Sequence, residues 1–434
     1  MSSTLPFDVL QDIVESLSQP RTIDRETLFK LSLTCRSLLP LCRKHIFSTI
    51  SLQPRSFDKN DPAKRPWPPN QNILYISITN MELLTTSSPS VVDWVRTFHL
   101  GLNAANVHDA GLVHLLDKFS FLESLFLTIL FNQLYWANLP FPLQTALARI
   151  IKLQSVTSLS LSNLGTIPLS SILPLSNVTH LNVASCGFSL PDPNHEWGSN
   201  TAPSQLTNFC IQRGFSSVLP LLEARYPNGF PVVDHSGLTL FSLQLQSDCE
   251  EYSAATFLAK LTSLQSLDMS SPGAGKPLPL RSTPFNGPLT YARTGGGYVS
   301  MANIMNRVHP QSAERLKVLW FQTNLGNIYP LSDVDSLPTT VLQSMPVMKS
   351  ILNLGITMNI ISPAKVEVLI QDFSKLDALL ASPQYATLTV VYIFLYFIGP
   401  TSLSRAELDA IPSIHMKRLS RNPSIKLIYE AHAD

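Results

Sequence analysis

The chain has 434 residues, of which 44% are hydrophobic and 14% are charged. This is long and apolar enough to bury a large core, which excludes a disordered polymer. The 31 Lys and Arg residues almost balance the 30 Asp and Glu residues, for a net charge of +1. Because phosphate binding needs uncompensated cations on one face, we expect no nucleic-acid partner.

The cysteines and the N-terminus favour an intracellular protein. Five cysteines, Cys35, Cys42, Cys186, Cys210 and Cys249, are scattered without a CxxC pair, which is typical of buried thiols in a reducing compartment. The first residues carry acidic side chains within their apolar pattern, unlike a signal peptide. The most apolar segment, 387–399, is shorter than the about 20 residues that a bilayer requires. We expect a cytoplasmic or nuclear protein without a membrane partner, and a buried strand in 387–399.

The first 50 residues predict a small helical head. Residues 5–17 place Val9, Leu10, Ile13, Val14 and Leu17 at helical spacing, with Pro6 at the first position. Asp24 is a good N-cap for a second helix that carries Leu28, Leu31, Cys35 and Leu38 and ends at Pro40. Residues 39–47 then predict a third short helix, which leads into a strand at 47–52. We assign 1–50 to this helical domain.

A proline-rich segment follows the head. Residues 53–71 contain five prolines and few aliphatic side chains, so they cannot form the interior of a sheet. We predict a linker over 51–72. A ligand for proline-binding domains is the alternative use of such a segment.

The remaining chain repeats a short pattern of alternating apolar residues. Most repeats are spaced by roughly 22 to 34 residues, with one longer gap. Segments 141–153 and 251–261 are typical of helices between the repeats, and 271–288 predicts an irregular excursion. The predicted strand segments begin at Val95, Leu122, Val156, Val178, Leu206, Leu238, Leu261, Arg315 and Met348.

This pattern resembles the LxxLxL strand of leucine-rich repeats. In that family an Asn or Cys often follows the strand, and Asn163, Cys186 and Asn324 stand at such positions. The resemblance implies an α/β fold, in which 73–434 form an irregular solenoid around a parallel sheet. One face of such a sheet presents alternate side chains as a broad surface, which suits a protein partner better than a small substrate.

Motifs for catalysis and phosphate binding are missing from the sequence. There is no GxSxG, HExxH, EF-hand or GxGxxG pattern, and Gly273–Lys276 lacks the first glycine and the final Ser or Thr of a phosphate loop. The histidines, including His108, His114 and His195, are dispersed. We therefore expect no catalytic residue, no cofactor and no metal. A hydrolase site assembled across repeats is the weaker alternative.

The head resembles the F-box motif in the type and order of its residues, from Leu5-Pro6 and Val9-Leu10 through Ile13 and Leu17 to the second helix and Arg36. Leu38 stands where many members have a tryptophan. The resemblance implies that the head binds the Skp-type adaptor of a cullin-RING ubiquitin ligase, while the solenoid selects an unknown target protein. The adaptor-binding residues that it implies are Leu5, Pro6, Val9, Leu10, Ile13, Leu17, Leu28, Leu31, Cys35 and Leu38.

Two other interpretations stay open. The head is also consistent with an N-terminal cap that covers the first strand of the solenoid, as terminal repeats require. A leucine-rich scaffold without a role in ubiquitination would bind partners but no cullin. A segment of about 45 residues is too small to bury its own apolar side chains, which favours a partner surface.

Overall fold

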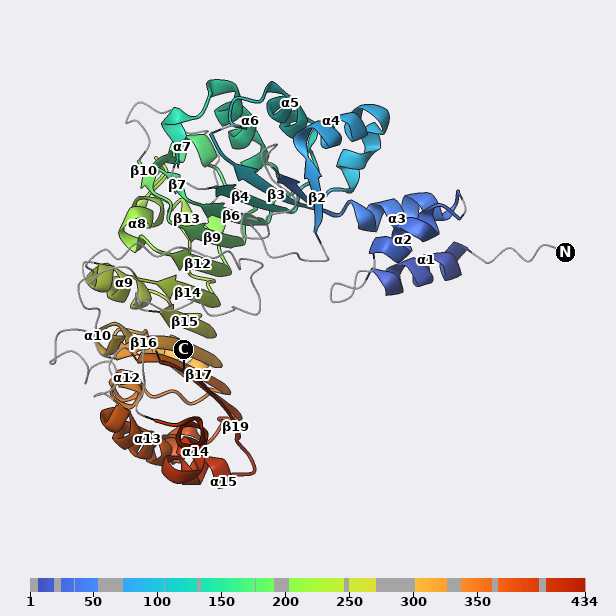
Figure 1. Cartoon of the computed structure of the whole chain (residues 1–434). Helices are drawn as coiled ribbons and strands as arrows, with labels where there is room; N and C mark the ends of the chain where they lie inside the picture. The colour runs from blue at the N-terminus through green and yellow to red at the C-terminus, as the bar shows by residue number, and fades with distance from the viewer. Residues whose placement is uncertain are drawn as a thin grey trace. The chain divides into compact units, whose positions relative to one another are not determined.

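The computed structural model separates the chain into two compact units. The first comprises Met1–Ser204 and Pro220–Val232, and the second comprises Gln205–Leu219, Val233–Leu278 and Leu289–Asp434. Figure 1 shows strands and helices alternating along the chain in both units. The residues that the structure describes are 7–18, 25–34, 36–53, 73–104, 106–130, 134–175, 177–190, 203–245, 250–270, 301–325, 337–360, 366–397 and 403–433.

The first unit begins with the helical head and continues into a parallel sheet with strand order β2-β1-β3-β4-β6-β9. Short helices connect these strands (Figure 1). Its elements are α1 (Phe7–Leu17), α2 (Arg25–Ser32), α3 (Leu38–Ile46), β1 (Thr49–Gln53), β2 (Leu74–Ser77), α4 (Ile78–Ser87), η2 (Pro89–Trp94), β3 (Thr97–Leu102), α5 (Ala110–Lys118), β4 (Ser124–Ile129), β5 (Leu134–Tyr135), η3 (Trp136–Asn138), α6 (Phe141–Ile151), β6 (Ser158–Ser162), β7 (Leu164–Gly165), β8 (Ile167–Pro168), α7 (Leu169–Ile172), β9 (His180–Ala184) and β10 (Phe188–Ser189).

The second unit is also built on parallel strands, in the order β12-β14-β15-β16-β17-β18-β19. The strands lengthen toward the C-terminus. The elements of this part of the chain are β11 (Ser204–Gln205), β12 (Asn208–Gln212), α8 (Phe215–Glu223), β13 (Val233–Asp234), β14 (Leu240–Gln244), α9 (Glu251–Leu258), β15 (Ser266–Ser270), α10 (Met301–Met305), α11 (Pro310–Arg315), β16 (Val318–Leu325), α12 (Pro338–Ser344), β17 (Asn353–Ile360), α13 (Val366–Leu380), η8 (Pro383–Tyr385), β18 (Val390–Phe397), α14 (Arg405–His415), α15 (Lys417–Arg421) and β19 (Lys426–Ala433).

Most strands of the repeats begin with the same backbone contact to the preceding repeat. Two consecutive N–H groups, those of Glu123 and Ser124, donate to the carbonyl of Arg96, and those of Thr157 and Ser158 donate to Glu123. The second unit repeats this arrangement at every step from β12 to β18. A strand of this parallel sheet forms its hydrogen bonds with the strands of the neighbouring repeats. The contact at its first residues therefore sets the register of the new strand.

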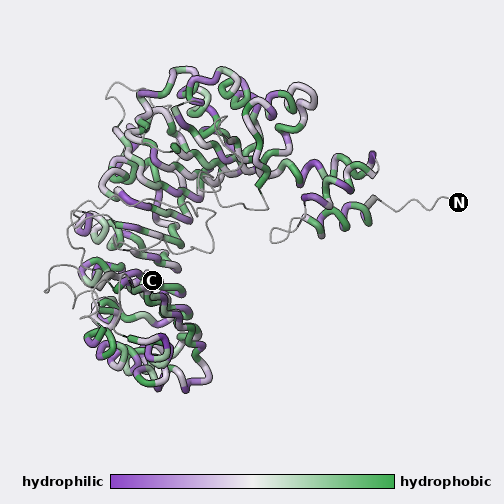
Figure 2. The backbone as a smooth tube through the Cα atoms, in the orientation of Figure 1, coloured by the Kyte–Doolittle hydropathy of each residue, from purple (hydrophilic) through white to green (hydrophobic). Residues whose placement is uncertain are grey.

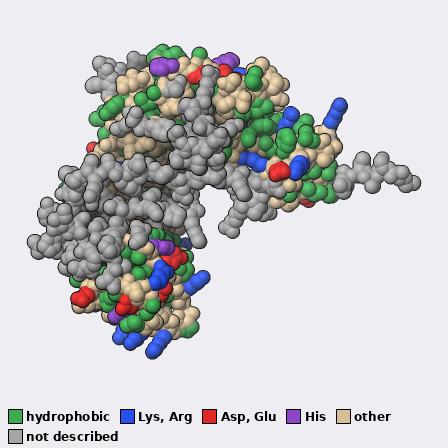
Figure 3. All heavy atoms as spheres, viewed as in Figure 1, with side chains coloured by type: hydrophobic (Ala, Val, Ile, Leu, Met, Phe, Trp, Pro, Cys, Tyr) green, Lys and Arg blue, Asp and Glu red, His purple; other side chains and the backbone are tan. Residues whose placement is uncertain are grey.

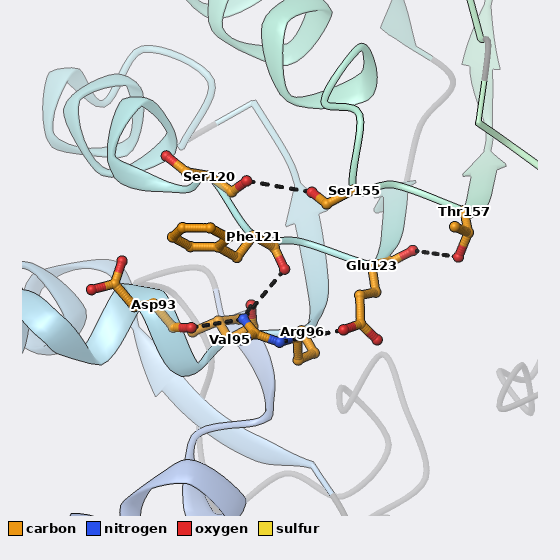
Figure 4. Close-up of polar contacts among 8 residues, drawn as sticks. All are labelled: Asp93, Val95, Arg96, Ser120, Phe121, Glu123, Ser155 and Thr157. Atoms are coloured by element: carbon orange, nitrogen blue, oxygen red, sulfur yellow. Dashed lines mark hydrogen bonds and ion pairs between the residues drawn. The ribbon is translucent and has the colours of Figure 1, made fainter.

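Side chains reinforce this edge of the first sheet (Figure 4). The guanidinium of Arg96 donates to the carbonyls of Asp93 and Phe121 at 2.7 and 3.4 Å, and it lies 3.3 Å from the Glu123 carboxylate. The Thr157 hydroxyl donates to the carbonyl of Glu123 at 3.3 Å. All of these groups form contacts close to the first residues of neighbouring strands. We therefore interpret the cluster as structural.

The leucine-rich positions of the strands face the core. In both units the residues at the inward positions are mostly buried, as Val183 and Leu319 are, whereas the neighbours of these two residues along the strand are partly exposed. Phe209 and Phe241 from two adjacent strands pack against Phe257 of α9, with ring centroids 6.0 Å apart between the two strands. Figure 2 shows this hydrophobic character recurring strand by strand. The apolar alternation in the sequence therefore identifies the side chains that face the core.

The predicted strands are confirmed. Each of the repeat segments contains one of β3, β4, β6, β9, β12, β14, β15, β16 and β17, and the apolar segment 387–399 contains β18. The helices expected in 141–153 and 251–261 are α6 and α9. The strands β2 and β19 were not predicted. The excursion at 271–288, Gly273–Lys276 and His195 lie outside the described residues.

Two boundaries near the head differ from the prediction. Pro40 does not end the second helix, which stops at Ser32; it lies in the first turn of α3, where a missing N–H leaves no hydrogen bond unmade. Leu38 accordingly begins the third helix. Strand β1 extends to Gln53, so residues 51–53 belong to the sheet and not to the linker. Residues 54–72 of the predicted linker lie outside the described residues.

Candidate functional site

The three helices of the head form a small core of their own. Val14, Leu28, Leu38, Cys42 and Ile46 are buried together, one or more from each helix. Further apolar side chains pack around this cluster without being fully buried, namely Leu10, Leu17, Leu31, Leu41 and Phe47.

Apolar side chains of the head also remain exposed on the helices. Val9 and Ile13 of α1 are 38% and 40% exposed, and Phe29 of α2 and Leu33, which follows the last residue of α2, are 57% and 69% exposed. The α1 pair has the i, i+4 spacing that places side chains on one face of a helix. Figure 3 shows hydrophobic side chains of this part of the molecule next to charged ones. Exposed apolar pairs on a small helical unit are typical of an interaction surface.

The head also contacts the sheet of the first unit. The ring of Phe47 stacks on Trp94 of η2 with centroids 6.4 Å apart, and the Arg25 guanidinium donates to the carbonyl of Thr49 at 3.3 Å. The head therefore joins the first strands through its second helix and the end of its third helix. Its exposed α1 pair lies on a different helix, so contact with the sheet and a free docking surface are compatible.

The structure divides the predicted adaptor-binding residues into groups. Leu28 and Leu38 are in the core of the head, Leu10, Leu17 and Leu31 are partly buried against it, and Val9 and Ile13 are exposed. Leu5, Pro6 and Cys35 lie outside the described residues. Phe29 and Leu33 were not among the predicted residues, although their i, i+4 spacing was readable from the sequence.

The outward positions of the two sheets form rows across neighbouring strands. In the first unit one row contains His99, Phe126, Ser160 and Asn182, in register. His99 stacks on Phe126 with centroids 4.2 Å apart, and burial lowers the pKa of His99 to about 4. Mostly small polar side chains follow, so this sheet presents little aromatic surface in its described part.

The second unit presents an aromatic row instead. We define the aromatic row as the partly exposed outward side chains Trp320, Tyr392, Phe394 and Tyr396. The Trp320 ring lies within 5.4 and 5.9 Å of Tyr392 and Phe394, centroid to centroid, and Tyr392 and Phe394 are inclined by only 12°. Such a surface offers several aromatic faces to one ligand.

Gly355 leaves room for the side chain of Trp320. Gly355 is the register partner of Trp320 on β17, and a Cβ at this glycine would overlap the Cδ2 and Cε3 atoms of the indole. The indole therefore crosses β17 directly over its backbone and reaches the rings of β18. Its Nε1–H donates to the Thr357 hydroxyl at 3.3 Å, which holds the ring in this orientation.

Carboxylates lie in register with the aromatic row. Asp268 of β15 is the register partner of Trp320 and accepts a hydrogen bond from the Ser242 hydroxyl at 3.3 Å. Burial raises the pKa of Asp268 to about 6. Glu430 of β19 is the register partner of Phe394, and its side chain is 54% exposed. The outward face of this sheet thus combines aromatic rings with negative charge.

The structure brings His108 and His114 to one shallow depression of about 370 Å³ in the first unit. Asp109 and Asp117 line it as well, but the Asp109 carboxylate already accepts the Gly111 N–H as the N-cap of α5. Within the described ranges, no group of three or more His, Cys, Asp or Glu side chains is suited to hold a metal ion.

The described cysteines are buried and unoxidised. Cys42, Cys186 and Cys210 are not in disulfides, and burial raises the pKa of Cys186 to about 12 and that of Cys210 to about 11. A thiol with such a pKa is protonated at neutral pH and a poor nucleophile. The prediction of buried thiols is confirmed for these three; Cys35 and Cys249 lie outside the described residues. None of the described helices has the length and apolar character needed to cross a membrane.

Comparisons with known proteins find no match to a family model and no match among curated proteins. Among solved structures, the chain is similar to the leucine-rich-repeat ectodomain of the plant membrane receptor kinase GASSHO1/SCHENGEN3 from Arabidopsis thaliana, crystallised with CASPARIAN STRIP INTEGRITY FACTOR 2. The identity is 10% and the TM-score is 0.21. The alignment covers 83% of this chain and 39% of the ectodomain, so the chain spans well under half of that protein's length. The mixed α/β architecture with a parallel sheet is compatible with a leucine-rich-repeat-like solenoid.

Proposed function

We propose that the protein is a non-catalytic substrate receptor of a Skp-cullin-F-box ubiquitin ligase. In this proposal the three-helix head binds the Skp-type adaptor and, through it, the cullin. The strands of the repeat units bind the protein that is to be ubiquitinated. Holding a target near the conjugating enzyme raises its effective concentration, so the receptor needs no reactive group of its own.

The observation that carries the proposal is the exposed apolar surface of the head. Val9 and Ile13 on α1 and Phe29 and Leu33 at α2 are left in solvent by a helical unit that has already formed a core. The order of residues in this head resembles the F-box motif, whose partner is the Skp-type adaptor. Leu28 and Leu38 support the surface from inside, because they hold the helices against one another.

Co-precipitation of the full chain with recombinant Skp-type adaptor tests the proposal. Replacing Val9 and Ile13 together by glutamate places two charges on an apolar contact without disturbing buried residues. We expect adaptor binding to weaken by 30-fold or more, equivalent to about 2 kcal/mol. The matched control is Leu83→Glu, an equally apolar residue of α4 that is 64% exposed outside the head.

The control variant should bind the adaptor as the unchanged protein does. The proposal is wrong if the unchanged protein fails to bind the adaptor, or if the glutamate variant binds it with unchanged affinity. A scaffold without a role in ubiquitination predicts the first of these results, with other partners still recovered.

A further inference from the structure

The aromatic row of the second unit has the chemistry to recognise a cation. Aromatic faces attract cations through the ring quadrupole, most strongly at tryptophan. The indole of Trp320 is held flat over Gly355 by steric fit and by its hydrogen bond to Thr357. Its orientation is therefore set before any ligand arrives, which lowers the entropic cost of binding.

The charges around the row favour a cation over an anion. Asp268 stands beside Trp320 and Glu430 beside Phe394, so carboxylates flank the rings on both sides along the register. Asp268 is partly buried, and its pKa of about 6 leaves it ionised at neutral pH. On the outward side of β19, Lys426 lies four residues before Glu430, roughly 13 Å along the strand, and His432 lies 3.4 Å from the Glu430 carboxylate.

A guanidinium group fits this combination better than an ammonium group. It is planar, so it stacks on a flat indole, and its fork of N–H donors matches a carboxylate. An ammonium group attracts the ring but offers neither the plane nor the fork. A neutral sugar could stack on the rings but would gain nothing from the flanking carboxylates.

We infer that the aromatic row and its flanking carboxylates form a docking site for an arginine-bearing segment of a partner protein. Trp320 would stack on the guanidinium, Asp268 would accept its N–H groups, and Glu430 would attract further basic side chains of the same segment. This site would define the chemistry of the segment that the proposed receptor recognises. That the partner is a target for ubiquitination rests on the proposed function.

Peptide arrays test the inference with the labelled full-length protein. The probes are nonapeptides with randomised flanks around a central arginine, with matched sets that carry citrulline, lysine or glutamate at the centre. Citrulline keeps the shape of arginine and removes its charge. We expect the arginine set to retain at least fivefold more protein than the citrulline set, and the glutamate set to retain the least.

Variants of the row assign the binding to this site. Trp320→Leu and Asp268→Asn should each reduce binding of the arginine set by about fivefold. Trp320→Phe keeps an aromatic face and should retain most of the binding, which separates loss of the ring from loss of the fold. Tyr252→Ala, at an aromatic residue of α9 that is 80% exposed, should leave binding unchanged.

Equal binding of the arginine and citrulline sets would overturn the inference, as would unchanged binding by both Trp320→Leu and Asp268→Asn. Binding of the unchanged protein to a glycan array that is lost in Trp320→Leu would assign the row to sugars instead. The adaptor experiment is independent of these arrays. Adaptor binding without arginine recognition would refute this inference alone, and arginine recognition without adaptor binding would refute the ligase role alone.

Discussion

The outward faces of the strands in the two units share a backbone pattern and differ in their side chains. In the first unit the row that begins at His99 continues through Ser160 and Asn182, whereas the equivalent row of the second unit leads from Asp268 to Trp320 and across to Tyr392. The inward positions of both units are mostly apolar and buried. The repeat thus fixes the inward positions and leaves the outward positions variable.

The largest expected effect is one that the two sheets should share. Leu161 of β6 and Leu319 of β16 are both completely buried at inward positions. Replacing either by alanine should lower the free energy of unfolding of its unit by about 2–5 kcal/mol, because each change opens a cavity in a packed core. Chemical denaturation followed by circular dichroism measures the loss. A negligible effect in one unit would show that its strands do not pack as the other unit's do.

The second prediction concerns how the stability of each unit depends on pH. Burial raises the pKa of Asp268 from 3.8 to about 6, so the folded state binds a proton that the unfolded state releases. Stability is therefore lost as pH rises from about 4 to 6, and above this range the charged carboxylate destabilises the second unit by up to about 3 kcal/mol. Ser160 occupies the equivalent row in the first unit and does not titrate.

Asp268→Asn should remove this pH dependence. At pH 7 the variant should unfold at a higher denaturant concentration than the unchanged protein, and near pH 4 the two should converge. Identical pH profiles for Asp268→Asn and the unchanged protein would contradict the burial of this carboxylate.

Glycines in the two outward faces provide the third comparison. A Cβ at Gly355 would overlap the fixed indole of Trp320, whereas a Cβ at Gly101 of β3 would meet the end of the Leu130 side chain at 3.0 Å, which can shift. Gly355→Ala should therefore cost about 1–3 kcal/mol, as overpacking does, and Gly101→Ala less. Thermal melts rank the two. A larger loss at Gly101 would mean that the indole does not lie over β17.

The smallest effect is expected at the edge of the first sheet. The ion pair of Arg96 and Glu123 is 38% and 60% exposed, so solvent screens it strongly (Figure 4). Glu123→Gln should change stability by less than about 0.5 kcal/mol. The same denaturation assay checks this, and a loss above 1 kcal/mol would make the pair a determinant of the first sheet.

The scaffold was predictable because its signal is local. The alternation of residues such as Leu159 and Leu161 places the inward side chains on one face of a strand, whichever repeat follows. The strand β19 was missed because Tyr429 and Ala431 stand at the inward positions, where the neighbouring strand carries large aliphatic residues.

The aromatic row was not predictable in the same way. It depends on the register that brings Gly355 beside Trp320 and on the ring contacts between β16 and β18, which are distant in sequence. A glycine within a strand and an isolated tryptophan carry no signal alone. In the head, by contrast, the exposed Phe29 and Leu33 could have been read from their spacing, and the position of Pro40 from the tolerance of a first helical turn for proline.

Affinity purification with quantitative mass spectrometry most directly tests whether the head binds the adaptor and the aromatic row binds the target. We expect the unchanged protein to recover the Skp-type adaptor, the cullin and a target. Val9→Glu with Ile13→Glu should lose the adaptor and cullin, and Trp320→Leu should lose only the target. Recovery of partners without adaptor or cullin by the unchanged protein would contradict this expectation.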